Sequence, residues 1–390
     1  MNKNKVFLKD MTYSLSSELS YLFYKIKSYF LKNNYTIVDS VDYADYILVC
    51  TYWYLSEVEK LTYDYILSLK EKISDKKLYI FWDLWSWKNS LKNIPFITDF
   101  VPTYDLTKLD RLFGWKYSIN DILSSEIEQD SIFHGDKWVD PNHKYYFLEI
   151  SAGCIHSCNF CQIKKNIWYV KSRSISQLVK ELEYAVKSGY NLIVLLWEDA
   201  WSYGLDIWTN FWELLDAFCN VKWDYQINIH YLHPAMALKY KDYIIRYIDK
   251  IYKFNMPIQS FSERILKKMN RFYKVDNVIN FIKDLKKIKP EIIIDNHIIY
   301  AFPGETFEEF LNNIKLSVKY YYRTVFIEYR YIEWTKKFSC DDLLNEDEIK
   351  KRKYVLLRMM KKYLEKNWDK WVNKINVLAG EETYKLVLEV

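Results

Sequence analysis

The first 125 residues alternate short apolar runs with longer segments of helical periodicity. The short runs predict buried strands at residues 5–8, 46–51 and 77–82. Between them, residues 16–32 place apolar side chains at helical spacing, and residues 55–72 show the same character. Strands that alternate with helices favour a small open parallel sheet, so we expect a separate α/β domain over residues 1–125.

The same alternation resumes after residue 144 with longer units. Strands are predicted six times, at residues 145–150, 192–196, 223–231, 256–259, 292–300 and 324–331. The helices between them are predicted at residues 175–188, 208–218, 234–248, 262–270, 275–288 and 306–320. Six consecutive units predict a partial (β/α)6 barrel over residues 144–335, and ligand sites of such barrels lie at the carboxyl ends of the strands.

Two further segments complete the predicted organisation. Residues 126–143 are polar, include Gly135 and Pro141, and are expected to form a linker. Residues 336–390 contain a charged amphipathic helix over 342–370 and a last strand over 385–390. The fold class is therefore α/β, with a small Rossmann-like open-sheet domain before the partial barrel. The first domain has neither a G-x-G-x-x-G sequence nor a phosphate-binding Walker loop, so nothing indicates a bound dinucleotide.

Composition and charge narrow the class of protein. The 390 residues are enough for two or three domains with a sizeable core. The net charge of +5 is spread along the chain, which permits contact with nucleic acid or an acidic peptide without requiring it. The amino terminus has no apolar signal segment, and no apolar run approaches the ~18 residues of a membrane span. We therefore expect a cytoplasmic protein without membrane contact.

Candidate chemistry concentrates in one short loop. Cys154, Cys158 and Cys161 follow the first predicted barrel strand with the spacing C-x3-C-x2-C. Three thiolates from one loop can ligate three irons of a 4Fe-4S cluster and leave the fourth iron open for a ligand. A structural zinc site with His156 as the fourth ligand is the alternative. Zinc ligands usually come in pairs from two separated segments, however, and the chain has no second pair.

This cysteine motif resembles that of radical S-adenosylmethionine (SAM) enzymes. Phe160 stands where that family usually has an aromatic residue before the third cysteine. The resemblance implies that the open iron binds the amino and carboxylate groups of SAM. It also implies that an electron from a donor such as flavodoxin or ferredoxin splits SAM into methionine and a 5'-deoxyadenosyl radical. An oxygen-sensitive cluster and unpaired cysteines again favour a reducing cytoplasm.

Over residues 146–335 the chain resembles the methylthiotransferase branch of these enzymes, whose members modify a tRNA adenosine or a ribosomal-protein aspartate. Five family motifs occur in order, as KSRS at 171–174, SYG at 202–204, HYLHP at 230–234, PIQS with RILKKMNR over 257–271, and FPGET at 302–306. Helix capping by Ser262 and Thr306 would account for two of them locally. It does not account for all five in order.

The chain also departs from the family. The family's amino-terminal domain holds an auxiliary cluster with three cysteines, and the matching positions here are Tyr13, Tyr52 and about Asp83. Because that cluster is the family's expected sulfur source, the resemblance implies that sulfur insertion is lost. The family's carboxyl-terminal substrate-binding barrel would begin near Val377 and is expected to be truncated, which weakens the case for RNA as a partner.

The resemblance also implies the residues that contact SAM. They are Phe160, Arg173, Glu198, Gln259 and Ser260, with cluster ligation by the three cysteines. The carboxylate of Glu198 suits the amino group of SAM, and the guanidinium of Arg173 suits its carboxylate, because charge-assisted pairs are the strong ones. The family's usual Gly-Gln-Asn is here Trp-Glu-Asp at 197–199, so a different substrate is expected.

Candidate catalytic residues come from the predicted strand ends. His230, His233 and His297 are all expected to face the barrel mouth, and Tyr231 stands beside the first of them. A lone histidine in a core is usually a packing residue. With three histidines at one mouth, a role in acid–base chemistry or substrate contact is as well supported as a role in packing. Tyr231 is a candidate hydrogen-atom donor.

The function expected from these features is that of a radical SAM enzyme acting on a peptide or natural-product substrate. Hydrogen abstraction would lead to rearrangement, epimerisation or crosslinking without sulfur insertion. One alternative is a cobalamin-dependent radical SAM methyltransferase, although the chain has no D-x-H-x-x-G motif. Another is a degenerate, non-catalytic relative that binds RNA or a protein partner, and the intact cysteine motif argues against it.

Overall fold

The computed structural model of the chain describes most of both predicted domains. The described residues are 4–11, 17–51, 56–73, 75–82, 91, 93–102, 105–132, 142–161, 169–196, 199–329, 342–366 and 375–377. The chain divides into two compact units, Met1–Phe147 and Leu148–Val390.

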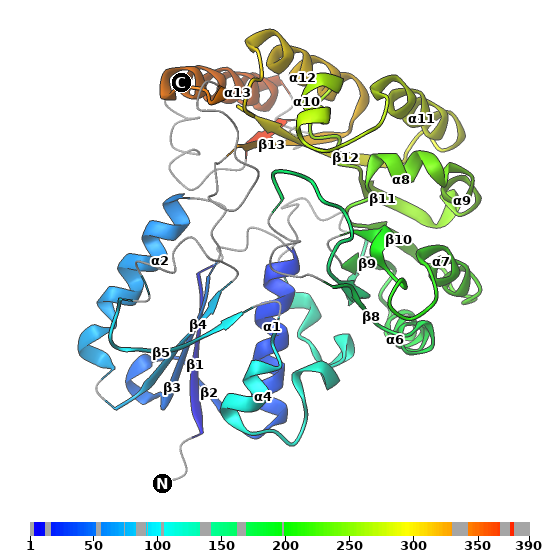
Figure 1. Cartoon of the computed structure of the whole chain (residues 1–390). Helices are drawn as coiled ribbons and strands as arrows, with labels where there is room; N and C mark the ends of the chain where they lie inside the picture. Colours follow the sequence, from blue (N-terminus) through cyan, green and yellow to red (C-terminus); the bar gives the residue numbers. More distant parts are fainter. Residues whose placement is uncertain are drawn as a thin grey trace. The chain divides into compact units, whose positions relative to one another are not determined.

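The first unit contains a five-stranded parallel sheet in the order β2-β1-β3-β4-β5 (Figure 1). Its strands are β1 (Lys5–Asp10), β2 (Thr36–Val38), β3 (Tyr46–Cys50), β4 (Lys77–Trp82) and β5 (Ile97–Pro102). This is an order of doubly wound α/β sheets, so the predicted Rossmann-like open sheet is confirmed. The sequence pattern missed β2 and β5, because β2 has only three residues and β5 has mostly half-buried and exposed positions.

The helices of the first unit bury one face each against this sheet. They are α1 (Ser17–Lys32), α2 (Ser56–Ser68) and α4 (Lys108–Phe113), with α1 and α2 on opposite sides of the sheet in Figure 1. In α1, Ile26, Tyr29 and Phe30 recur at helical spacing and are fully buried, as the sequence pattern predicts.

The predicted linker over residues 126–143 begins as an ordered part of the first unit. Short 3-10 turns at Ser124–Glu126 and Gln129–Ser131 lie along α1. Lys32 forms an ion pair with Glu126 at 2.6 Å, and Lys27 pairs with Glu128 at 2.8 Å. Acidic residues that the sequence pattern assigned to a solvated connection therefore bind lysines of α1.

The second unit contains a seven-stranded sheet in the order β14-β13-β12-β11-β10-β9-β6. Its strands are β6 (Tyr145–Glu149), β9 (Leu192–Leu196), β10 (Gln226–Ile229), β11 (Ile251–Asn255), β12 (Ile293–Tyr300), β13 (Arg323–Glu328) and β14 (Ile375–Val377). The strand pairs from β9 to β14 are all parallel. The first six strands in chain order are the six predicted units, which confirms the partial barrel.

One predicted strand is displaced along the chain. Residues 256–259 were expected to form the fourth barrel strand, but that strand is β11, at Ile251–Asn255. Pro257 has no N–H group to donate to a strand ladder, so the ladder ends before it. Residues 256–259 instead form the segment that follows the strand, and only Gln259 makes an isolated bridge, to Ile298.

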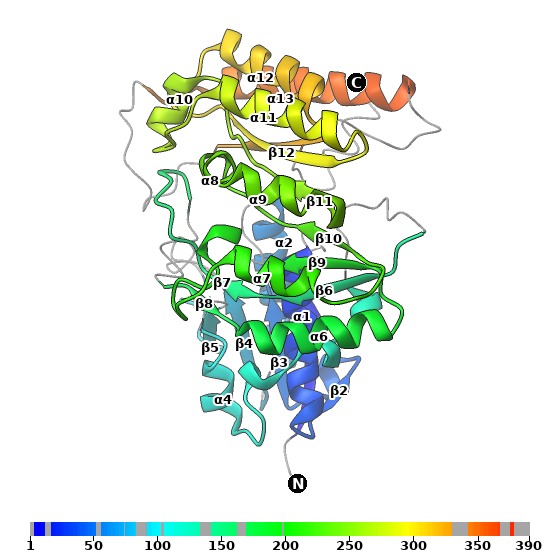
Figure 2. The same cartoon turned by 90° about the vertical axis from the view of Figure 1, so that its right-hand side faces the viewer.

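Helices cover the outer face of the second sheet (Figure 2). They are α6 (Ile175–Lys187), α7 (Phe211–Cys219), α8 (Pro234–Lys239), α9 (Lys241–Arg246), α10 (Glu263–Lys268), α11 (Val275–Ile288), α12 (Phe307–Tyr320) and α13 (Glu346–Lys366). The single helix predicted over 234–248 is therefore two short helices with a break at Tyr240, whose φ of −119° is not helical.

The direction of side chains along β12 defines the two faces of this sheet. The ring of Tyr300 lies 6.2 Å from that of Phe310 in α12, so even-numbered positions of β12 point to the helices. Successive side chains of a strand alternate between faces. Asp295 and His297 therefore point to the opposite, concave face, which is the inside of the partial barrel.

The carboxyl-terminal region differs from the prediction. Residues Ile375–Val377 form β14, which pairs in parallel with β13, at the position where the resemblance places the start of the family's carboxyl-terminal barrel. The strand predicted over 385–390 lies outside the described residues. Across the described parts of the chain, no helix has both the length and the apolar character that crossing a membrane requires.

Candidate active site

The three clustered cysteines lie in a hairpin loop that follows β6. The strands of this hairpin are β7 (Ser151–Ala152) and β8 (Lys171–Ser172), and they pair antiparallel. The thiols of Cys158 and Cys161 both act electrostatically on Cys154, whose pKa is raised by burial and by Asp199. The three cysteines therefore share one loop beside the sheet.

The end of α10 holds one side of this loop. The backbone N–H of Asn159 donates to the carbonyl of Met269 at 3.0 Å, and its side-chain amide donates to the carbonyl of Lys268 at 2.6 Å. The amide of Asn270 donates in return to the carbonyl of Ser157 at 2.8 Å. Carbonyls of the last helical turn have no partner inside a helix, and the cysteine loop supplies donors for them.

The turn after β9 holds the other side. The N–H of Ile155 donates to the Ser202 hydroxyl at 3.0 Å, and that hydroxyl donates to the Asp199 carboxylate at 2.8 Å. Nε2 of His156 lies 3.3 Å from the same carboxylate, and its ring stacks on His233 with centroids 4.1 Å apart. These contacts join His156 to the segments that follow β9 and β10. Among the described side chains, no three or more His, Cys, Asp or Glu are grouped to hold a single metal ion.

A buried arginine lies against the second cysteine. The guanidinium of Arg271 donates to the Cys158 thiol at 3.5 Å and to the carbonyl of Pro257 at 2.5 Å. It also lies 5.8 Å from the centre of the Phe160 ring. Thiolates are the ligands of iron–sulfur clusters, and a buried cation requires an anion nearby. The donor set and its surroundings therefore fit a cluster with three thiolate ligands.

Three strand ends of the second sheet have strained backbone. Tyr231 after β10, Gln259 after β11 and Ala301 after β12 have φ values of 44°, 70° and 58°. A positive φ is unfavourable for residues other than glycine, and such strain concentrates at functional sites.

Three of the four predicted catalytic residues lie together at these strand ends. The ring of Tyr231 is 5.8 Å from that of His230 and 5.6 Å from that of His297. Nε2 of His297 is 3.0 Å from the side-chain nitrogen of Asn255. His233 lies elsewhere, since its Nδ1 accepts from the N–H of Ala235 at the start of α8 and its ring stacks on His156.

The environment of His233 determines its charge. Burial lowers the pKa of this imidazole, and the neighbouring Arg271 and His156 lower it further. A neutral imidazole accepts a hydrogen bond through its unprotonated nitrogen, which is what the cap of α8 requires. His233 therefore connects the cysteine loop to the end of β10 as a packing and capping group.

The concave face below the histidines has a polar floor that sequence reasoning missed. Asp295 accepts from Lys253 on β11 at 2.9 Å and from Arg323 on β13 at 2.8 Å, through the same oxygen. Asn228 on β10 is in register with Lys253, so both point to this face. Within the described residues, Oδ1 of Asn228, of Asn255 and of Asp295 are buried without a hydrogen-bond partner.

Comparisons with known proteins identify the family. A family model described as the Radical SAM superfamily matches residues 148–316. A probable threonylcarbamoyladenosine tRNA methylthiotransferase of Pyrococcus horikoshii is 34% identical over 181 residues, which are 46% of this chain and 43% of the relative. The ribosomal protein uS12 methylthiotransferase RimO of Thermosipho africanus is 31% identical over 303 residues, which are 75% of this chain and 69% of the relative. The chain belongs to the methylthiotransferase family of radical SAM enzymes.

Solved structures show the same fold in other radical SAM enzymes. One is the methyltransferase TsrM of Kitasatospora setae, with cobalamin and a [4Fe-4S] cluster bound. The matched region covers 85% of this chain and 73% of the TsrM chain, at 11% sequence identity and a TM-score of 0.51. For the cobalamin-dependent enzyme OxsB, the matched region covers 90% of this chain and 55% of the OxsB chain, at 13% sequence identity and a TM-score of 0.55. Family membership gives this radical SAM enzyme a 4Fe-4S cluster and SAM as cofactors. The chain spans less than half of the archaeal relative's length.

The residues predicted to contact SAM in this radical SAM enzyme differ from one another in their surroundings. Glu198 lies outside the described residues. Gln259 is buried at the strained end of β11, and Oε1 of its side chain has no hydrogen-bond partner among the described residues. The ring of Phe160 faces Arg271. Gln259 and Phe160 are thus next to the cysteine loop or the barrel mouth, and their contact with SAM stays a prediction.

Arg173 and Ser260 have partners within the protein. The guanidinium of Arg173 forms an ion pair with the buried Glu181 of α6 and donates to the carbonyl of Glu149 at 3.1 Å. The hydroxyl of Ser260 is fully buried and accepts from the N–H of Ser262 at 3.1 Å. These contacts give both side chains a structural role, and a contact of either with SAM stays a prediction.

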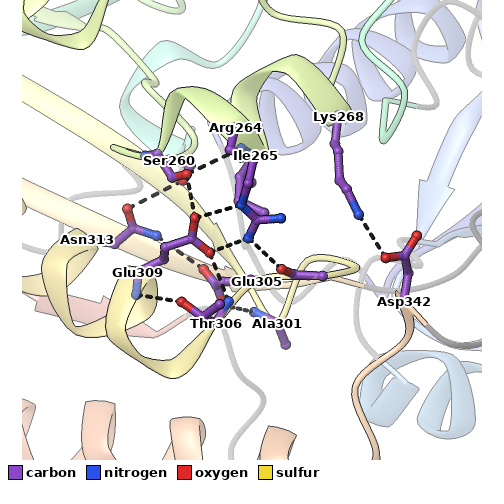
Figure 3. A network of polar contacts seen from close by, with 12 residues as sticks. Ser260, Arg264, Ile265, Lys268, Ala301, Glu305, Thr306, Glu309, Asn313 and Asp342 are labelled. Carbon is purple, nitrogen blue, oxygen red and sulfur yellow. Dashed lines mark hydrogen bonds and ion pairs between the residues drawn. The ribbon is translucent and has the colours of Figure 1, made fainter.

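A polar network on the helix side supports the strained turn at Ala301 (Figure 3). The carboxylate of Glu305 accepts from the N–H of Ala301 at 2.8 Å and from the amide of Asn313 at 3.1 Å. Thr306 caps α12 in a capping box with Glu309, and Ser262 caps α10, so the local capping interpretation of both motifs is confirmed.

Burial also changes the acidity of this network. It raises the pKa of Glu305 to about 7, although the nearby Arg352 opposes the shift.

Proposed function

We propose that this chain cleaves SAM reductively at a cluster ligated by Cys154, Cys158 and Cys161, and abstracts hydrogen from a peptide or natural-product substrate without inserting sulfur. The observation that carries the proposal is the placement of the three thiols in one loop, which contacts the ends of β9 and β10. When bound, the cluster supplies the electron that splits SAM. The residues of this chain hold the loop, orient SAM and receive the substrate.

The polar floor supports a compact polar group as the part of the substrate that enters the barrel. A buried acceptor without a partner costs about 1–3 kcal/mol, and the floor has three such oxygens among its described residues. A substrate group with hydrogen-bond donors would satisfy them. His297 and Tyr231 stand at the rim of this floor, where a proton or hydrogen atom would be exchanged with the substrate.

The absence of sulfur insertion is proposed from the sequence. The positions that match the family's auxiliary-cluster cysteines are Tyr13, Tyr52 and about Asp83, and all three lie outside the described residues. Cys50 is the nearest cysteine in sequence to Tyr52. It is buried on β3, and a single cysteine there does not supply the several thiolates that an auxiliary cluster needs.

Partners follow from the same chemistry. Reductive cleavage requires an electron donor, for which flavodoxin or ferredoxin is suited. The relatives act on tRNA or a ribosomal protein by their names, so RNA stays an alternative partner to the peptide or small molecule. A cytoplasmic location remains a prediction from the sequence.

The products formed from SAM test this function. The reconstituted protein would be incubated anaerobically with SAM and dithionite, and the nucleosides would be separated by chromatography. We expect 5'-deoxyadenosine in wild type and none with Cys158→Ala. Methyl transfer from SAM releases S-adenosylhomocysteine, so equal amounts of both nucleosides in the presence of substrate would contradict a reaction without methylation. Unchanged 5'-deoxyadenosine with Cys158→Ala would reject the cluster assignment.

Radical methylation with cobalamin is the second candidate. It is favoured by one observation, the doubly wound five-stranded sheet of the first unit, because the similar solved structures are cobalamin-dependent enzymes. Their likeness concerns the fold alone. Cobalamin absorption after reconstitution with the free cofactor, together with S-adenosylhomocysteine formation, would favour this candidate. A protein that elutes free of cobalamin would favour the first.

A further inference from the structure

Arg271 is a buried cation directly beside the cysteine loop. The residue is 7% exposed and follows α10, whose end binds the loop. Its guanidinium contacts the Pro257 carbonyl at 2.5 Å, the Tyr273 hydroxyl at 3.5 Å and the Cys158 thiol at 3.5 Å. The ring of Phe160 lies 5.8 Å away. Among the described residues, these contacts are neutral dipoles, an aromatic ring and a thiol that becomes anionic as a metal ligand.

Two other arginines of the second unit, the buried Arg352 and the mostly buried Arg323, each have a carboxyl partner. Arg323 lies 2.8 Å from Asp295, and Arg352 lies 3.4 Å from Glu305. For Arg271, no carboxylate of the described residues lies within ion-pair distance. A charge that is buried without an opposite charge costs several kcal/mol. Within the part of the chain that the structure describes, the Cys158 sulfur is the contact of Arg271 that supplies that charge when it is a thiolate.

We propose that Arg271 is the counter-ion of the cluster and raises its reduction potential. Reduction adds one electron, and therefore one negative charge, to the cluster, while the guanidinium keeps its charge. Attraction between the two is strong in a buried site and stabilises the reduced form more than the oxidised form. Hydrogen bonds to the cluster's sulfurs and its net charge are the terms that set such potentials. The inference rests on the proposed ligation by Cys158.

The structure also fixes the position of this cation. The carbonyl of Pro257 anchors the guanidinium from the segment that follows β11, and the Tyr273 hydroxyl donates to the carbonyl of Ile258 in the same segment at 2.5 Å. That segment leads to Gln259, a predicted SAM contact. Arg271 is therefore a positioning residue that joins the cluster loop to the strand end where SAM is expected.

The test compares Arg271→Gln and Arg271→Lys in the whole reconstituted chain. The reduced fraction of the cluster would be followed by electron paramagnetic resonance during a redox titration without SAM. At the wild-type midpoint, we expect the ratio of reduced to oxidised cluster to fall about tenfold with Gln, a shift of ~59 mV to more negative potential for one electron. The lysine variant keeps the charge and should retain most of the wild-type ratio.

Arg264→Gln is the matched control. Arg264 is on α10 and is half exposed, and its guanidinium pairs with Glu309 at 2.6 Å rather than with the cysteine loop. The same substitution there should leave the midpoint potential unchanged. A shift equal to that of Arg271→Gln would contradict the proposal, because it would attribute the effect to α10 as a whole.

Further results decide the inference. An intact cluster with an unchanged midpoint in Arg271→Gln would overturn it, as would a lysine variant shifted as far as the glutamine variant. If glutamine prevents cluster assembly, iron content replaces the potential as the readout. A cluster that assembles in the lysine variant but not in the glutamine variant would support the role of the positive charge. Loss of the cluster in both variants would reject that role. A wild type without any cluster would instead reject the proposed function.

Discussion

The two sheets of this protein both alternate parallel strands with helices, but they differ in the side chains that their strands carry. In the first sheet, β3 has the sequence YILVC and buries Ile47, Leu48 and Val49 completely. In the second sheet, β12 places Asp295 and His297 on its concave face between apolar positions. Architecture alone therefore does not locate the chemistry. Polar residues inside a strand that is otherwise apolar do so, because their burial has a cost that a ligand or an ion pair must offset.

The largest contrast between the sheets concerns their cysteines. Cys158→Ala should abolish cluster assembly and reduce 5'-deoxyadenosine to background, because the remaining two thiolates leave an iron without its protein ligand. Cys50→Ala in the first sheet makes the same substitution at a cysteine outside the loop and should leave both unchanged. Iron analysis and chromatography measure the two effects. A cluster lost equally in both variants would remove the distinction between the sheets.

Replacing a carboxylate in each sheet sharpens the comparison further. Asp295→Asn removes the charge that Lys253 and Arg323 share, so we expect the free energy of unfolding to fall by about 3–5 kcal/mol. Asp99→Asn on β5 breaks a partly exposed ion pair with Lys108 and should cost no more than about 1 kcal/mol. Denaturant unfolding measures both. Equal losses would show that the polar floor has no special energetic role.

Glu305 gives the second unit a pH dependence. Its pKa rises from the ordinary value of 4.5 to about 7, so the folded protein favours the protonated carboxyl. The stabilisation is complete below pH 4.5 and is lost as the pH rises through about 7, with a total on the order of 3 kcal/mol. Because glutamine resembles the protonated carboxyl, wild type and Glu305→Gln should have similar unfolding free energies at low pH, and wild type should become the less stable of the two as the pH rises. An advantage of wild type that grows with pH would contradict this sign.

The smallest effect is expected at the surface of the same network. Arg264 is half exposed and pairs with Glu309 (Figure 3). Arg264→Gln should lower the free energy of unfolding by no more than about 1 kcal/mol, because water screens an exposed pair. Thermal unfolding would measure the difference. A loss as large as that of Asp295→Asn would mean that exposure does not separate the two kinds of ion pair.

The sequence predicted the fold where apolar periodicity was strong. Strands β3, β4, β9 and β12 and helices α1, α11 and α12 lie close to their predicted positions. It failed where local signals were weak, as at the three-residue β2, and where Pro257 ended β11 earlier than its apolar neighbours suggested.

The candidate site likewise has parts that the sequence predicted and parts that it did not. The spacing of Cys154, Cys158 and Cys161 is local in sequence, so the loop was recognisable. The contact of Arg271 with Cys158 spans 113 residues and depends on how α10 packs, which no linear pattern encodes. The polar floor left one signal, polar residues within the otherwise apolar runs QINI and IIDNHIIY. His233 caps α8 and stacks on His156 of the cysteine loop, and its catalytic role stays a prediction.

The central claim is that one cluster, held by the loop of the second unit, initiates the chemistry. Iron and acid-labile sulfide per chain after anaerobic reconstitution test it most directly. The account predicts about four of each, and loss of all of them with Cys158→Ala. About eight irons, with about four remaining in that variant, would place a second cluster elsewhere in the chain and contradict the claim.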